Sequence, residues 1–323
     1  MRFVSENKKW FAGLLAAIVL IIGSTFVVKS QFFFNLLTLI LIWSINGMGW
    51  NVIGGYCGQV SNGHAMFYAV GAYTVGVCAS KFHLTPWISL PIGMVIAAAL
   101  AFVIGKPLLR LKGHVFAIST MALAESVRII FNNWGWVGGA TGIFIMAKGK
   151  NPWISLQFKD IRNYVYIYLF FMVIILILIK FLDKTKFFYY LRTIKGNQLA
   201  AESIGIDAAK YKNRAFMLSA AIVALGGGLY AQYILYIDPS TLLTLNISMM
   251  IVLVAVMGGV GTVEGPILGA IILQTISEYS RKYLGTYGGV DMVLYGVLVI
   301  LIVLFIPGGI LSIFKKRNKK AAA

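Results

Sequence analysis

The sequence predicts an all-α polytopic membrane protein, a bundle of about 8–10 transmembrane helices in a single domain over residues 1–323. Two observations support this fold class. Of the 323 residues, 59% are hydrophobic and only 12% are charged, whereas a soluble domain carries roughly 25% charged residues to cover its surface. Several apolar runs also approach the length of about 20 residues that a helix needs to cross the hydrocarbon core of a bilayer.

Ten apolar runs are candidate membrane spans. Lipid offers backbone groups no hydrogen-bond partners, so each run must be helical or part of a closed barrel, and long continuous runs favour helices. The run at 246–258 is short unless it extends back through Thr241, and eight spans remain an alternative if two runs are re-entrant. The predicted spans are 10–28, 32–53, 64–80, 87–105, 114–131, 163–182, 215–235, 246–258, 266–283 and 289–306.

The basic residues predict the orientation of the bundle. Ten spans place both termini on the same side, together with the loop at 183–214, and this side holds eighteen Lys and Arg residues against eight on the other. Because basic loops stay in the cytoplasm, we expect both termini and this loop to be cytoplasmic and the loop at about 132–162 to be external. The net charge of +18 therefore indicates orientation and contact with the anionic lipid bilayer rather than nucleic-acid binding.

A glycine-rich segment at 54–64 joins two apolar runs. Its glycines and polar groups predict a break in the helix, and broken backbone at membrane depth is tolerated where it lines a cavity or is buried in protein. One interpretation is a wall of a translocation path, and the other is a short loop with a glycine turn. The candidate path residues are Gly58, Gln59, Ser61, Gly63 and His64.

A second glycine-rich joint covers 257–266, where Gly258, Gly259 and Gly261 are further candidates for the path. Pro266 suits the first turn of the helix that follows, because its missing N–H group has no helical partner there. One joint lies early in the chain and the other late. This arrangement predicts two repeated halves, as in many transporter folds.

The loop at 183–214 contains a predicted short amphipathic helix at 197–204. Leu199, Ala200 and Ile204 fall on one face of it, and Gly205 is a plausible C-terminal stop. A helix of this kind either lies on lipid or docks into the groove of a partner protein.

The charged and nucleophilic residues predict no catalytic or metal site. Glu125 and Arg128 are spaced i, i+3 and can form an intramembrane ion pair, either functional or structural. The three histidines lack the spacing of metal ligands. No G-x-x-x-x-G-K-[ST] motif is present to hold nucleotide phosphates. We therefore expect no catalytic residues, no metal and no cofactor.

Five motifs between residues 55 and 310 resemble those of branched-chain amino acid ABC transporter permeases of the LivM type. In order, they are GYCGQVSNGHAMFYAVGAY (55–73), LKGHVFAISTMALAE (111–125), TIKGNQLAAESIGI (193–206), VMGGVGTVEGPILGA (256–270) and IPGGI (306–310). The resemblance implies an importer in the bacterial cytoplasmic membrane, built from a heterodimer of two permeases, two ATPases and an extracellular solute-binding protein. ATP hydrolysis would then belong to a separate subunit, and this chain would not be an enzyme.

The same resemblance implies a coupling segment that contacts the ATPases. The ABC importer pattern E-A-A-x-x-x-G is matched here at Ala200, Ala201 and Gly205, while Leu199 replaces the leading glutamate. Glu202 also lies within this segment. Because Leu199 stands where the pattern has a glutamate, the role of an acidic residue in the segment is left open.

Several alternatives to branched-chain amino acid import remain at this point. Related importers with these motifs carry urea, short amides or other amino acids. An ion-coupled secondary carrier would need buried carboxylates, for which Glu125, Glu264, Glu278 and Asp291 are the candidates near spans. A membrane enzyme is disfavoured because no catalytic set is present.

Overall fold

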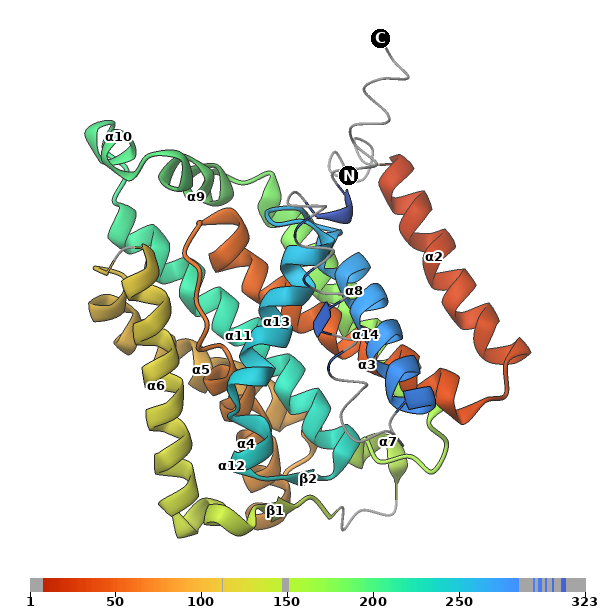
Figure 1. The fold of residues 1–323 in the computed structure, drawn as a ribbon. Coiled ribbons are helices and arrows are strands. Elements are labelled where there is room, and N and C mark those ends of the chain that lie inside the picture. The colour runs from red at the N-terminus through yellow and green to blue at the C-terminus, as the bar shows by residue number, and fades with distance from the viewer. Residues whose placement is uncertain are drawn as a thin grey trace.

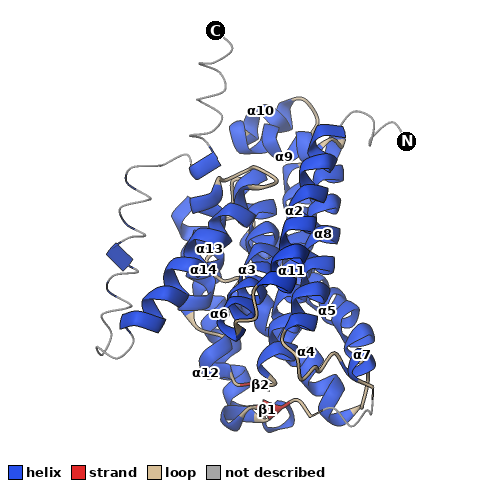
Figure 2. Ribbon diagram, turned by 90° about the vertical axis from the view of Figure 1, so that its right-hand side faces the viewer, coloured by secondary structure: helices blue, strands red, loops and turns tan. Residues whose placement is uncertain are grey.

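The computed structural model describes residues 8–111, 113–146 and 151–284, with a few isolated residues between 293 and 311. Long helices run between two ends of a bundle, with α9 (Lys186–Gly196) and α10 (Gln198–Ser203) at one end and β1 (Ile143–Phe144) and β2 (Tyr236–Ile237) at the other (Figures 1 and 2). The long helices are α2 (Lys8–Val27), α3 (Gln31–Trp50), α4 (Ala65–Lys81), α5 (Pro86–Leu108), α6 (Gly113–Asn133), α8 (Arg162–Asp183), α11 (Ala208–Ile234), α13 (Leu245–Gly258) and α14 (Gly265–Leu284).

Short elements connect these helices. Their bounds are η1 (Asn51–Tyr56), η2 (Gly135–Val137), η3 (Gly139–Thr141), β1 (Ile143–Phe144), α7 (Pro152–Ser155), α9 (Lys186–Gly196), α10 (Gln198–Ser203), β2 (Tyr236–Ile237) and α12 (Pro239–Leu242). The two strands pair antiparallel, with Ile143 opposite Ile237.

The predicted all-α polytopic fold is confirmed. Long helices occupy nine of the ten predicted runs, and the tenth, at 289–306, lies outside the continuously described residues. Within the described chain, seven helices are long and apolar enough to cross a membrane. The chain is therefore a multi-pass membrane protein. The predicted loop at 183–214 is mostly helical, because it contains α9 and α10 and because Asp207 caps α11, which starts seven residues before the predicted 215.

Helix α11 lies at the centre of the bundle and packs against α5, α4 and α3. The close approach of α4 and α11 depends on glycine, because small residues let helix backbones come together in a membrane. A Cβ atom on Gly71 would lie 1.9 Å from the carbonyl oxygen of Ala224, and one on Gly227 would lie 1.9 Å from that of Tyr68. Larger side chains at these positions would push the two helices apart.

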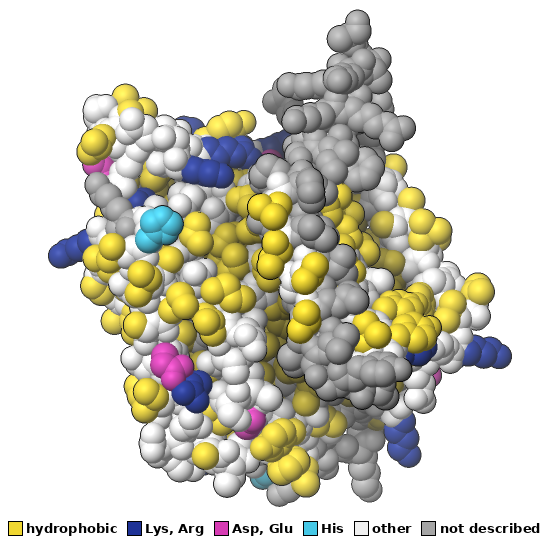
Figure 3. Space-filling model, in the orientation of Figure 1, with side chains coloured by type: hydrophobic (Ala, Val, Ile, Leu, Met, Phe, Trp, Pro, Cys, Tyr) yellow, Lys and Arg dark blue, Asp and Glu magenta, His cyan; other side chains and the backbone are white. Residues whose placement is uncertain are grey.

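The outer surface of the bundle is apolar, as a lipid-facing surface requires. Hydrophobic side chains are spread widely over the described part of the face shown in Figure 3, and most of the Lys and Arg side chains lie toward its edges. Helix α2 contacts α8 at the margin of the bundle, and Leu20 and Phe26 on α2 are each 72% exposed. A soluble monomer rarely exposes apolar patches of this extent, so this surface agrees with a position in the bilayer.

Candidate functional site

The first glycine-rich segment leaves the helical pattern after η1 and runs without regular structure to α4. Gly58 takes a left-handed conformation, with φ of +74°, which favours glycine because a Cβ would be strained there. Side chains of neighbouring helices satisfy the freed backbone groups. The indole N–H of Trp50 donates to the carbonyl of Ser61 at 2.7 Å, and the N–H of Asn62 donates to Thr120 Oγ1 at 3.1 Å.

This segment crosses from one end of the bundle to its interior. Gly58 lies beside Lys195 of α9, since a Cβ on Gly58 would come within 2.8 Å of Lys195 Cγ. His64 is fully buried, and its Nε2 lies 2.9 Å from Ser219 Oγ on α11. Ser219 is eleven residues into α11, which at 1.5 Å per residue is about 16 Å from the start of that helix.

The predicted path residues of this segment therefore fall into two environments. Gly58 and Gln59 lie near the α9 end and are at least partly exposed, whereas Ser61, Gly63 and His64 are buried among α6, α11 and α13. A lining role for these residues stays a prediction.

The second joint turns sharply between α13 and α14. Gly259 and Gly261 have φ values of +136° and +76°. Gly258 is buried where the two helices pack, and a Cβ there would lie 1.7 Å from the carbonyl oxygen of Gly265. Its position is that of a packing residue, so the structure offers no separate support for lining by Gly258.

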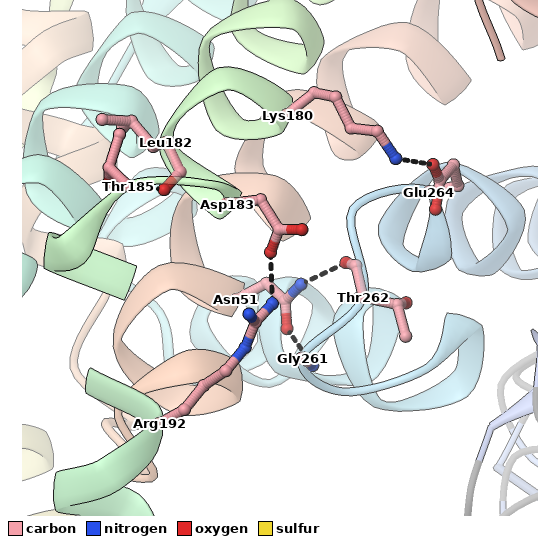
Figure 4. A network of polar contacts seen from close by, with 9 residues as sticks. All are labelled: Asn51, Lys180, Leu182, Asp183, Thr185, Arg192, Gly261, Thr262 and Glu264. Atoms are coloured by element: carbon pink, nitrogen blue, oxygen red, sulfur yellow. Dashed lines mark hydrogen bonds and ion pairs between the residues drawn. The ribbon is translucent and has the colours of Figure 1, made fainter. Parts of the chain in front are cut away.

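The two joints touch each other through Asn51, at the start of η1. The Asn51 side chain accepts a hydrogen bond from the N–H of Gly261 at 2.8 Å and donates one to the carbonyl of Thr262 at 2.7 Å (Figure 4). The backbones of Gly55 and Gly261 also lie in contact, since a Cβ on Gly55 would come within 2.7 Å of Gly261 N. Segments that the sequence places some 200 residues apart thus form one structural unit.

Helix α9 is attached to this unit by charged groups. Lys195 Nζ donates to the carbonyl of Gly55 at 2.8 Å. Arg192 pairs with Asp183 at the end of α8 and lies over the ring of Tyr56. Beside these contacts, Lys180 of α8 pairs with Glu264 at 3.3 Å (Figure 4). A displacement of α9 would therefore act on both joints.

The predicted short helix at 197–204 is present as α10, directly after α9. Asn197 caps its first turn, with Oδ1 accepting from the N–H of Ala200 at 3.1 Å. Gly205 ends it with φ of +86°. The N–H of Gly205 donates to Glu202 and that of Ile206 to Ala201, each at 3.0 Å, which is the hydrogen-bond pattern of a Schellman motif.

The faces of α10 differ from the predicted ones. The residue buried against the chain is Ala201, which packs with Ile194 and Ala208, whereas the predicted apolar face held Leu199, Ala200 and Ile204. Leu199 and Ile204 are each 71% exposed. The helix therefore presents two large apolar side chains outward at the end of the bundle.

The other charged site predicted from sequence is on α6. Glu125 and Arg128 form an ion pair on this helix, and their side chains are 51% and 33% exposed. The pair lies at the surface of the chain, and Glu125 lines a small pocket together with Asn62 of the first joint. Within the described residues, no group of three His, Cys, Asp or Glu side chains could hold a metal ion.

Sequence reasoning missed Asn51 and Lys195. Asn51 lies near the end of the predicted span at 32–53, where a buried amide side chain needs a polar partner. Its position within an apolar run could therefore have indicated a hydrogen bond to another segment. Lys195 looked like one basic residue among the many of its loop, and its contact with Gly55 becomes visible only in three dimensions.

Comparison with known proteins matches residues 32–303 to the model of a family described as the branched-chain amino acid transport system / permease component. The chain belongs to this family. Its α10 segment, its two joints and its bundle of spans are thus features of a transport permease component.

Curated relatives include both kinds of permease. The chain is 29% identical to the high-affinity branched-chain amino acid transport system permease protein LivM of Escherichia coli strain K12, over 95% of this chain and 76% of that protein. It is 26% identical to the probable branched-chain amino acid transport permease protein LivH of Methanocaldococcus jannaschii, over 78% of this chain and 82% of that protein. No solved structure matches the chain.

Proposed function

We propose that this chain is one permease subunit of an ATP-driven importer of branched-chain amino acids and forms half of its translocation path. The family match over most of the chain carries this proposal, and the names of the LivM and LivH relatives supply the substrate class. Because relatives of both kinds match, the second half of the path is a related but different permease. The importer lies in the cytoplasmic membrane of a bacterium, with both termini and α10 in the cytoplasm.

In this proposal, α10 is the contact with the ATPase subunits. Ala200, Ala201, Glu202 and Gly205 belong to the coupling segment, and the exposed Leu199 and Ile204 supply apolar side chains for a groove on the ATPase. An amphipathic helix in a groove is a common mode of peptide recognition. A separate solute-binding protein delivers the amino acid at the opposite end.

The mechanism follows from the contacts of α9. Closure of the ATPases on ATP pushes α10 and, through it, α9. Lys195 transmits this displacement to Gly55, and Asn51 transmits it to Gly261. The two joints then move together and change the access of the path. Coupling of this kind is reciprocal, so the state of the path also biases nucleotide binding.

The carboxylates do not favour an ion-coupled carrier. Glu125 pairs with Arg128, Glu264 with Lys180, and Glu278 with Arg281 at 3.2 Å. A carrier for protons or sodium needs a carboxylate whose partner is the transported ion, and each of these three already has a basic partner. Asp291 lies outside the described residues.

Reconstitution of the purified complex in proteoliposomes tests the proposed function. Uptake of labelled leucine should need ATP and the binding protein, and unlabelled isoleucine and valine should compete. If urea, a short amide or another amino acid inhibited leucine uptake more strongly than isoleucine and valine do, that compound would be assigned as the substrate instead. Uptake that persists without ATP and stops when ion gradients are collapsed would identify a secondary carrier instead.

A further inference from the structure

A pocket of about 740 Å³ lies between the end of α5 and the start of α11. It is at the same end of the bundle as α10, and Gln198 of α10 forms part of its wall. Neither the translocation path nor the exposed face of α10 accounts for it.

The charge of this pocket is strongly positive. Five basic residues line it, against the single carboxylate of Asp207. Asp207 is engaged by the backbone, since its Oδ1 accepts from the N–H of Lys210 at 2.9 Å. The basic residues are Lys106, Arg110, Lys210, Lys212 and Arg214. Charge of this sign and density attracts a phosphate group.

The pocket also contains a buried acceptor without a partner. Asn213 is 8% exposed, and its Oδ1 has no hydrogen-bond partner among the described residues. Its Nδ2 makes a long contact of 3.5 Å with the carbonyl of Phe102. A Cβ on Gly105 would lie 2.3 Å from Asn213 Oδ1, so the glycine leaves room for this oxygen. Because this oxygen is closed to solvent, a ligand hydroxyl would satisfy the acceptor once the Asn213 side chain turns toward the pocket.

The remaining wall of the pocket is apolar and continues onto the outer surface of α5. Phe102, Leu109 and Met217 line the pocket. Beyond it, Val103 and Val95 on α5 are 65% and 68% exposed. A ligand that suits the whole site has an anionic head with a hydroxyl group and an apolar tail that lies along α5.

We propose that this pocket binds the headgroup of an anionic phospholipid that carries a free hydroxyl, such as phosphatidylglycerol. Basic pockets between transmembrane helices on the cytoplasmic side suit such headgroups. The position of the lysines and Arg110 at the end of α5 and the start of α11 places the phosphate where a cytoplasmic leaflet would hold it.

Binding at this site would also act on α10. Lys212 is buried and donates to Gln198 Oε1 at 2.7 Å, while Gln198 Nε2 donates to Glu202 at 2.8 Å. A headgroup phosphate beside Lys212 changes the position of its ammonium group and hence of α10. This consequence for ATP coupling and the cytoplasmic location of the pocket rest on the proposed function, whereas retention of the lipid by the purified protein does not.

Native mass spectrometry of the purified full complex, without ATP, tests the binding. The protein is titrated with phosphatidylglycerol and with phosphatidylcholine, and bound lipid is counted. We expect preferential retention of phosphatidylglycerol. Arg110→Gln and Lys210→Gln, which change exposed side chains, should each lower the affinity for phosphatidylglycerol about fivefold. This factor corresponds to about 1 kcal/mol per basic residue near a membrane surface. Lys186→Gln, which removes an exposed charge of α9 outside the pocket, should change this affinity less than either.

Three results would overturn the proposal. Equal retention of the two lipids, or equal losses in the pocket and control variants, would show that the pocket is not the lipid site. Displacement of phosphatidylglycerol by inorganic phosphate alone at millimolar concentration would assign the pocket to a free anion. Because these measurements need neither transport nor ATP, a failure of the proposed function would not mimic any of these results.

Discussion

Asn51 holds the backbone of Gly261, 210 residues further along the chain, through its side-chain amide. The same amide donates to Thr262, so that both of its polar atoms are used. This single side chain fastens the break after α3 to the break between α13 and α14. The two breaks are therefore not independent hinges.

Replacing Asn51 with alanine should loosen this connection. The N–H of Gly261 and the carbonyl of Thr262, which are partly buried, would lose their partner, and an unsatisfied buried polar group costs about 1–3 kcal/mol. We expect a lower thermal unfolding midpoint of the purified complex and slower leucine uptake. Asn133→Ala is the matched control, because Asn133 is exposed at the end of α6 and bonds only within its own helix. Equal effects of the two substitutions would refute the role of Asn51.

Lys195 should be needed for coupling rather than for assembly. Lys195→Ala removes the hydrogen bond to the Gly55 carbonyl, so ATP hydrolysis should continue while uptake per ATP falls. Lys195→Arg keeps a donor and should retain part of the uptake. The control is Lys186→Ala, since Lys186 is an exposed residue of the same helix. The ratio of transported leucine to hydrolysed ATP measures the effect, and an unchanged ratio in Lys195→Ala would contradict the proposed mechanism.

Much of the fold could be predicted from the sequence, because hydrophobic length and helix stops are local signals. The span at 163–182 became α8 (Arg162–Asp183), and Gly205 ended α10 where a positive φ was needed. Contacts over long distances could not be predicted in this way. The pairing of Asn51 with Gly261 and of Lys195 with Gly55 depends on the arrangement of the helices, and the burial of Ala201 depends on its neighbours Ile194 and Ala208.

Leu199 and Ile204 should determine the affinity for the ATPase. Burying one such side chain in a partner contributes about 1.5–3 kcal/mol, so Leu199→Asp or Ile204→Asp should weaken the complex roughly tenfold or more. Both side chains are 71% exposed, so the chain itself should still fold. Ile154→Asp is the control, since Ile154 is half exposed on α7. Retention of the ATPase during affinity purification of the permease measures the effect, and full retention by both α10 variants would exclude this surface as the contact.

Gly227 should be intolerant of any side chain. In Gly227→Ala the new methyl group would meet the backbone oxygen of Tyr68, and overpacking of a core costs about 1–3 kcal/mol. The purified protein should unfold at a lower temperature. Gly13→Ala on α2 provides the comparison, because no atom lies within 4 Å of the added Cβ, and it should leave the unfolding midpoint unchanged. Equal unfolding midpoints of the two variants would contradict the close packing of α4 against α11 at Gly227.

Gly205 permits a graded test of the coupling segment. Gly205 has a φ of +86°. A residue with a Cβ adopts this left-handed conformation at a cost of roughly 1–2 kcal/mol, and asparagine at a lower cost. Gly205→Asn should therefore keep most of the uptake, while Gly205→Val and Gly205→Trp should distort the end of α10 and separate ATP hydrolysis from uptake. Gly196→Ala is the matched control, because Gly196 is helical and has open space around it. Normal transport by an assembled Gly205→Trp complex would show that the geometry of this helix end does not matter for coupling. A decline in uptake from asparagine to valine and tryptophan, with ATP hydrolysis maintained, would instead tie coupling to the left-handed conformation of one residue.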